Sequence, residues 1–180
     1  MVMKKFKGML MGIMFLTIAT PQMVYADVPA WQEVVAESRE STLLEKDEVT
    51  SKNILNDTAR GIRLSTAMLS ITNEQDGTLH IVVDTFTHKD VDRIYEVVFL
   101  DMWDEKKEDW VQIEDWSFEK SKEETDDGKL SSYRVSFLVT GCELNHYYRA
   151  RAMHLVEWDG DQMEGKATET DGVLLTDHEV

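Results

Sequence analysis

The stretch YYRARAMHLVEWDG, residues 147–160, alternates between two kinds of side chain, as a β-strand requires. The smaller and more apolar set is expected to face a core: Tyr148, Ala150, Ala152, His154, Val156 and Trp158. The opposite set is Tyr147, Arg149, Arg151, Met153, Leu155 and Glu157. The closing Asp-Gly pair is typical of a hairpin turn. We therefore predict a core strand that runs into a hairpin, with an outer face that either binds a ligand or pairs with acids on a neighbouring strand.

Period-two runs of this kind recur from residue 61 onwards, and turn signals separate them. The expected strands cover residues 62–72, 78–88, 93–103, 110–120, 130–140 and 147–158, with a last strand or pair within 163–176. No helical period is sustained after residue 60. About seven short strands with regular turns predict an all-β fold, an antiparallel β-sandwich. A closed barrel is the alternative.

Three of these runs carry finer information. Residues 93–103 are apolar on both faces, which predicts a central strand whose outer face holds Tyr95, Val97, Phe99 and Trp103. The alternation of 110–120 slips near Glu114 and Asp115, which indicates a β-bulge. The core face of 130–140 is expected to consist of Tyr133, Val135, Phe137 and Val139.

The first 26 residues have the order of a secretory signal peptide. A basic start with Lys4, Lys5 and Lys7 precedes the apolar run 8–20, and the small-residue exit Val-Tyr-Ala ends at Ala26. We expect cleavage there and a secreted protein with no membrane contact afterwards; an uncleaved anchor is the alternative. Residues 27–59 are polar and acidic and are expected to form an arm or linker, partly helical or disordered, ahead of a domain at 60–177.

Charge and cysteine content exclude several classes of function. The leader holds three of the 19 basic residues and none of the 35 acidic ones, so the mature chain has a net charge of −19. Such a chain is not expected to bind nucleic acid. The single cysteine, Cys142, allows no internal disulfide bond. Its role is left open between a small buried residue and a reactive thiol.

Catalytic and metal-binding patterns are sparse. There is no Gly-x-Ser-x-Gly elbow and no glycine-rich phosphate loop, so an enzyme is not expected, with a secreted hydrolase as an alternative. One cysteine and widely spaced histidines do not form a zinc pattern. We expect no cofactor. If calcium binds, the first candidates are the loop carboxylates Asp101, Asp104, Asp159 and Asp161.

Aromatic and arginine side chains form the candidate interaction surface. Its members are Trp103, Trp110, Trp116, Tyr147, Arg149 and Arg151. Exposed aromatic rings on a sandwich can dock a partner protein or stack on a sugar, although tryptophans also commonly fill the core. The sequence therefore favours a non-catalytic extracellular binding module, with a protein or a cell-wall glycan as the partner.

Two resemblances accompany this interpretation. The run ELNHYYRARAM resembles the entry to strand F of fibronectin type III and immunoglobulin-like domains, which implies that Leu144 and Tyr148 form a tyrosine corner. The blocks ARGIRLSTAMLSITNEQDGTL, VDRIYEVVFLDMWDEKKEDW, YYRARAMH and TDGVLLT together resemble a family of small secreted proteins of unknown function from Gram-positive bacteria. That resemblance implies secretion and one β-domain, and it brings no catalytic residues.

Overall fold

The period-two runs form strands almost where the alternation indicates them. The computed structural model describes residues 41–56 and 62–180. Its strands are β1 (Thr50–Asn56), β2 (Leu64–Asn73), β3 (Leu79–Thr87), β4 (Arg93–Asp104), β5 (Asp109–Ser121), β6 (Ser132–Val139), β7 (Tyr147–Trp158), β8 (Gln162–Glu169) and β9 (Val173–Leu174). One 3₁₀ turn, η2 (Lys122–Glu124), lies between β5 and β6. Within the described residues, no helix is long and apolar enough to span a membrane.

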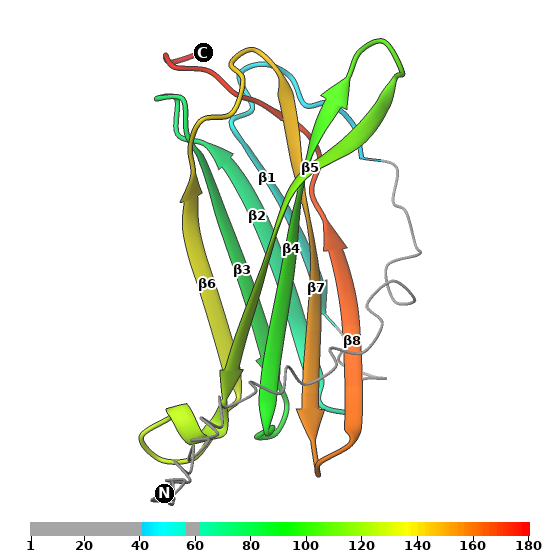
Figure 1. The fold of residues 1–180 in the computed structure, drawn as a ribbon, viewed down its shortest axis with the longest axis vertical. Helices are drawn as coiled ribbons and strands as arrows, with labels where there is room; N and C mark the ends of the chain where they lie inside the picture. The colour runs from blue at the N-terminus through cyan, green and yellow to red at the C-terminus, as the bar shows by residue number, and fades with distance from the viewer. Residues whose placement is uncertain (1–40, 57–61) are drawn as a thin grey trace, which may run out of the picture. The chain divides into compact units, whose positions relative to one another are not determined.

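The strands form two antiparallel sheets, which confirms the predicted β-sandwich. One sheet has the order β1-β2-β3-β6, and the other has the order β5-β4-β7-β8, with β9 pairing with β7 beyond the end of β8 (Figure 1). Hairpins join β2 to β3, β4 to β5 and β7 to β8 within a sheet, whereas the chain crosses between sheets from β3 to β4, from β5 to β6 and from β6 to β7. As predicted, β4 is a central strand.

The core lies between the facing surfaces of the two sheets. The predicted inner face of β7 is buried throughout, from Tyr148 to Trp158. The larger apolar cluster contains Leu69, Ile71, Leu79, Ile81, Val83, Val98, Leu100, Tyr148, Ala150, Ala152, Val173 and Leu175. The smaller one contains Leu64, Ala67, Val91, Ile94, Leu130, Val156 and Trp158. The burial of these side chains drives the association of the two sheets.

A polar layer interrupts the core. The Thr85 hydroxyl on β3 lies 2.7 Å from Glu96 Oε1 on β4 and 2.8 Å from His154 Nδ1 on β7. The Nε2 atom of His154 lies 2.9 Å from the hydroxyl of Thr168 on β8. Burial raises the pKa of Glu96 to about 8 and lowers the pKa of His154 to about 3. Both side chains are therefore uncharged in the core near neutral pH.

The start of the domain differs from the expectation for residues 27–59. Residues 50–56 form strand β1 and pair with β2 along its length, from Thr50 opposite Thr72 to Asn56 opposite Thr66. Upstream of this strand, Leu43 bridges to Gly172 in the parallel sense. Residues 41–56 therefore belong to the sandwich and not to an arm. The predicted leader and residues 27–40 lie outside the described residues.

Candidate functional site

Five of the six residues of the candidate interaction surface lie together on the outer face of the β5-β4-β7-β8 sheet. They are Trp103 on β4, Trp110 on β5, and Tyr147, Arg149 and Arg151 on β7. Trp116 does not join them, because it opposes the inward-facing Val98 and packs on Phe137 in the core. Trp116 therefore lies apart from the other five residues, beside the groove between β5 and β6 that is described below. An unpaired bulge residue, Ile113, separates the two tryptophans of β5 and turns them to opposite faces.

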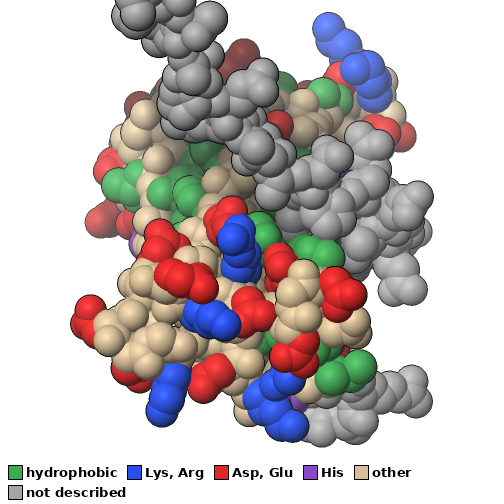
Figure 2. Space-filling view, turned by 60° about the horizontal axis from the view of Figure 1, so that its bottom comes forward, with side chains coloured by type: hydrophobic (Ala, Val, Ile, Leu, Met, Phe, Trp, Pro, Cys, Tyr) green, Lys and Arg blue, Asp and Glu red, His purple; other side chains and the backbone are tan. Residues whose placement is uncertain are grey.

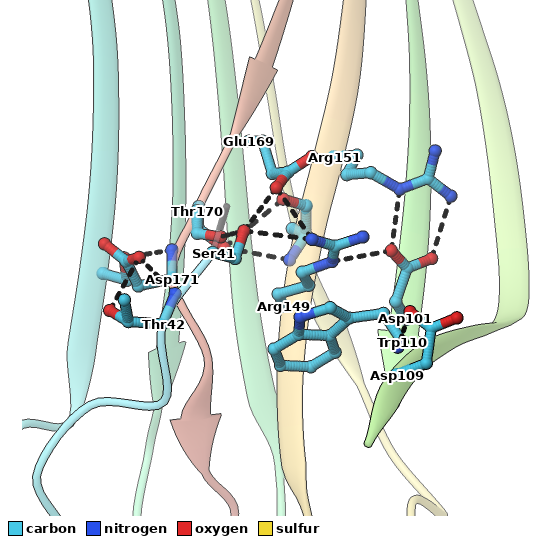
Figure 3. A network of polar contacts seen from close by, with 12 residues as sticks. Ser41, Thr42, Asp101, Asp109, Trp110, Arg149, Arg151, Glu169, Thr170 and Asp171 are labelled. Atoms are coloured by element: carbon cyan, nitrogen blue, oxygen red, sulfur yellow. Dashed lines mark hydrogen bonds and ion pairs between the residues drawn. The ribbon is translucent and has the colours of Figure 1, made fainter. Parts of the chain in front are cut away.

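A buried carboxylate organises this outer face (Figure 3). Asp101 accepts two hydrogen bonds from Arg151, at 2.7 and 2.9 Å, and one from Nε of Arg149 at 2.9 Å. Arg149 also donates to Glu169 at 2.7 Å. The two arginines thus pair with acids on neighbouring strands, which is one of the two alternatives that the sequence left open.

The indole of Trp110 is occupied by contacts within the chain. The Arg149 guanidinium lies 4.7 Å from the ring centroid, and the Trp103 ring packs edge-on at 5.3 Å. A Cβ atom placed on Gly172 would lie only 2.5 Å from the indole, so the backbone of Gly172 packs directly against it. These contacts reduce the area that Trp110 offers for stacking on a sugar ring.

The segment from Ser41 to Leu44 covers the side of the sandwich between β1 and β8. Leu44 donates to the Gly172 carbonyl at 2.9 Å, and Gly172 donates to the Thr42 carbonyl at 2.8 Å. The Ser41 hydroxyl contacts the Glu169 carboxylate and accepts a hydrogen bond from Arg149 at 3.0 Å. This side is also tied across the two sheets, because Glu164 on β8 accepts from the backbone N–H of Arg63 and of Leu64.

The opposite side of the sandwich, between β5 and β6, holds a groove with a cavity volume of about 620 Å³. In Figure 1 the end of β5 and the start of β6 lie close together near the η2 turn, and the two strands separate towards the other end of the sheets. Leu100, Met102 and Tyr148 form the floor of the groove, Ile113, Glu114 and Trp116 line its β5 wall, and Phe137, Leu138 and Val139 line its β6 wall. The turn at residues 140–143 closes one end.

Three local features shape this groove. The Trp116 ring packs edge-on against Phe137 at 5.0 Å and bridges the two walls. The bulge at Ile113 breaks the register of β5 just above that contact, and 42 % of the Ile113 side chain is exposed. At the closed end, the Tyr148 hydroxyl donates to the Glu143 carbonyl at 2.9 Å. This hydrogen bond has the geometry of a tyrosine corner, as expected for Tyr148.

The groove lining is mixed, with apolar side chains in its floor, polar groups over more of its exposed surface, and an acidic rim. Its charged members are Glu114 and Glu143, and the lining residues include no lysine or arginine. Cys142 also lines it, half-buried, and burial raises the pKa of its thiol. A raised pKa slows the reaction of the thiol near neutral pH, while its partial exposure keeps it accessible to a reagent.

The four calcium candidates do not converge. Asp101 is held by two arginines, and Asp104 pairs with Lys107 at 3.1 Å. Asp159 and Asp161 lie in the β7–β8 turn. Asp101 lies opposite Arg149 on β7, and Asp159 comes ten residues after Arg149. At the rise of a strand, Asp101 and Asp159 are therefore roughly 30 Å apart. Among the described residues, no cluster of three or more potential metal ligands forms. The described structure thus does not bring these four candidates together, and calcium binding by any of them stays a prediction.

The end of the sandwich that carries Asp159 is strongly charged. Figure 2 shows Asp and Glu side chains gathered over this end, with Lys and Arg between them. Lys122 pairs with Asp92 at 2.5 Å, and Arg63 lies 3.9 Å from Asp159. Such mixed-sign charge favours solubility and does not define a binding site by itself.

The Thr85, His154 and Glu96 cluster combines residue types that catalysts use, but its geometry is unsuitable. All three side chains are at most 1 % exposed, so no substrate reaches them. In a catalytic triad the histidine lies between the hydroxyl and the carboxylate. Here the Thr85 hydroxyl lies in the middle and contacts both Glu96 and His154. The lowered pKa of His154 makes it a weak base.

Comparisons with known proteins identify no relative: no protein-family model matches the chain, and a search of curated proteins finds no significant match. The groove is the feature that sequence reasoning missed. Its one sequence signal was the slip in the alternation of β5, which places the bulge at its wall.

Proposed function

We propose that this chain is a secreted, non-catalytic binding module whose ligand site is the groove between β5 and β6. The single observation that carries the proposal is a solvent-open groove with an apolar floor. Leu138 and Ile113 line its mouth with 60 % and 42 % of their side chains exposed. Exposed apolar groups around a concavity are typical of a binding site. Secretion is proposed from the N-terminal pattern of residues 1–26.

We also propose an immunoglobulin-like relationship for the domain. The hairpins and sheet crossings described above support it, as does the position of the tyrosine corner at the start of β7. The extra strand β1 extends the sheet beyond β2. Membership in the family of small secreted Gram-positive proteins is a proposal of the same kind, based on the sequence blocks alone.

The rival sites receive less support. The carbohydrate alternative needs an open tryptophan face, and Trp110 is packed against Arg149 and Gly172. The hydrolase alternative needs a reactive group in an open cleft, and the Glu96 cluster is enclosed. A binding role at the groove therefore fits the described residues better than a sugar platform at Trp110 or a hydrolase site at the Glu96 cluster.

The test is a screen of residues 27–180 against arrays of peptides and cell-wall glycans. A groove variant, Ile113→Ser with Leu138→Ser, is compared with a control variant, Ile54→Ser with Phe86→Ser, because all four side chains are exposed and apolar. We expect ligands that bind the native protein and the control but lose affinity for the groove variant. Ligands that bind all three proteins equally, or no ligand at all, would contradict the proposal.

A further inference from the structure

Both walls of the groove are edge strands. In the described sheets, β6 pairs with β3 on one side only, and β5 pairs with β4 on one side only. An edge strand presents a row of backbone N–H and C=O groups that has no strand partner. The groove therefore combines apolar side chains in its floor with backbone hydrogen-bonding groups along its walls.

The two edges differ in their protection against pairing. Strand β5 carries the bulge at Ile113 and the charged residues Asp109, Glu114, Asp115, Glu119 and Lys120. Bulges and charges are the devices by which edge strands avoid adding a further strand. Strand β6 carries a single charge, Arg134, and its register with β3 is regular. The β6 edge is thus the one that is open to strand addition.

The charge of the groove selects the partner. Glu114 and Glu143 lie in the lining, no lysine or arginine does, and the whole chain has a formal net charge of −16. The imidazole of His146 lies 3.9 Å from Glu143. A second copy of this chain would bring like charges together, which disfavours self-association. A cationic partner is attracted instead.

We propose that the groove receives an extended peptide segment with alternating apolar and cationic side chains, which pairs with the free edge of β6. This inference rests on the proposed function and names its ligand class. Apolar side chains of one parity would enter the floor between Trp116 and Val139. Because successive side chains of a strand point to opposite faces, the cationic side chains of the other set lie on the solvent side, where the net negative charge of the chain attracts them, and backbone hydrogen bonds to β6 set the register.

The test uses the only cysteine of the chain as a reporter. Cys142 lines the groove, so a bound strand slows its alkylation by a thiol reagent. We expect the peptide KVKVKVK to slow this reaction and added salt to weaken its effect. The acidic peptide EVEVEVE should leave the rate unchanged. The same KVKVKVK peptide with alternate backbone nitrogens methylated should also fail, because methylation removes the donors while keeping the charge.

A matched pair of variants locates the charge effect. Glu114→Lys should weaken KVKVKVK about tenfold, equivalent to about 1.4 kcal/mol, whereas Asp115→Lys should leave its affinity nearly unchanged. These residues are adjacent on β5, but Glu114 lines the groove and Asp115 opposes Phe99 on the outer face. Equal protection by EVEVEVE or by the methylated peptide would overturn the strand proposal. If KVKVKVK fails but a ligand from the array screen protects Cys142, only the ligand class is wrong.

Discussion

The two sides of this sandwich are closed in different ways. On the β1–β8 side, Glu164 ties the backbone of β2 to β8, and the segment from Ser41 to Leu44 is hydrogen-bonded over the seam. On the β5–β6 side, an aromatic contact between Trp116 and Phe137 bridges the strands at one level, and the groove opens beyond it. The first side therefore has several of its polar groups paired within the chain, whereas the second has an open groove.

The largest expected effect concerns the carboxylate that holds the outer face together. Asp101→Ala leaves the half-buried Arg149 and Arg151 without their shared acceptor, and it should lower the free energy of unfolding by about 3 kcal/mol. Denaturant unfolding of residues 27–180 measures the change. The control Asp104→Ala, which removes the partner of the exposed Lys107, should cost less than about 1 kcal/mol. Equal losses would show that the network does not stabilise this face.

The polar layer in the core predicts a dependence of stability on pH. The folded-state pKa of Glu96 is raised from 4.5 to about 8, so its effect on stability is fully favourable below pH 4.5 and is lost as the pH rises towards 8. The folded-state pKa of His154 is lowered from 6.5 to about 3, so its contribution is lost as the pH falls from 6.5 towards 3. The two effects oppose each other between pH 4.5 and 6.5, where a plateau is expected.

Above the plateau only the Glu96 effect remains. The free energy of unfolding should fall by about 2 kcal/mol between pH 6.5 and 8. Glu96→Gln should abolish this slope, while Glu119→Gln, which alters a carboxylate paired with Arg93 at the surface, should keep it. Denaturation curves at a series of pH values provide the measurement. If the free energy of unfolding of the native protein does not change between pH 6.5 and 8, the raised pKa of Glu96 is refuted.

The contact between the Gly172 backbone and the Trp110 indole offers a test of close packing. Gly172→Ala places a methyl group against the indole and should cost about 1 to 2 kcal/mol. The same substitution in a Trp110→Ala background should cost much less, since the contact is gone. Thermal unfolding of the four proteins in this cycle gives the coupling. An unchanged cost in the Trp110→Ala background would place the strain elsewhere.

The smallest expected effect is on the open side. Ile113→Ser with Leu138→Ser should change the free energy of unfolding by no more than about 0.5 kcal/mol per site, because both side chains are exposed. The measurement is again denaturant unfolding. A loss of several kcal/mol would mean that these residues support the fold and that the groove is not a free surface.

Alternation was sufficient to predict most strands, and the exceptions have physical causes. In β7, one face is buried in the core and the other carries arginines that pair with neighbouring acids. Because the two faces differ in polarity, the strand at residues 147–158 was predicted correctly. Strand β1 was missed because it is an edge strand with Ser51 as its only fully buried residue, which leaves no apolar alternation to detect. Glu96 on the inner face of β4 could not be explained from sequence, because its partner Thr85 comes from the other sheet.

The candidate surface was partly predictable for a similar reason. Trp110 and Trp116 are an even number of residues apart, so a regular strand would put both on one face. A slip was recognised near Glu114 and Asp115, but any bulge between the two rings separates them, and the structure places it at Ile113. The groove depends on the separation of β5 and β6, which no local pattern in either strand encodes.

Amide hydrogen exchange with and without KVKVKVK tests most directly whether the β5–β6 side is the ligand site. Our account predicts slower exchange in β6 and the 140–143 turn when the peptide is bound, with no change in β1 or β8. Slower exchange along Thr50–Asn56 or Gln162–Glu169, with β6 unaffected, would contradict it.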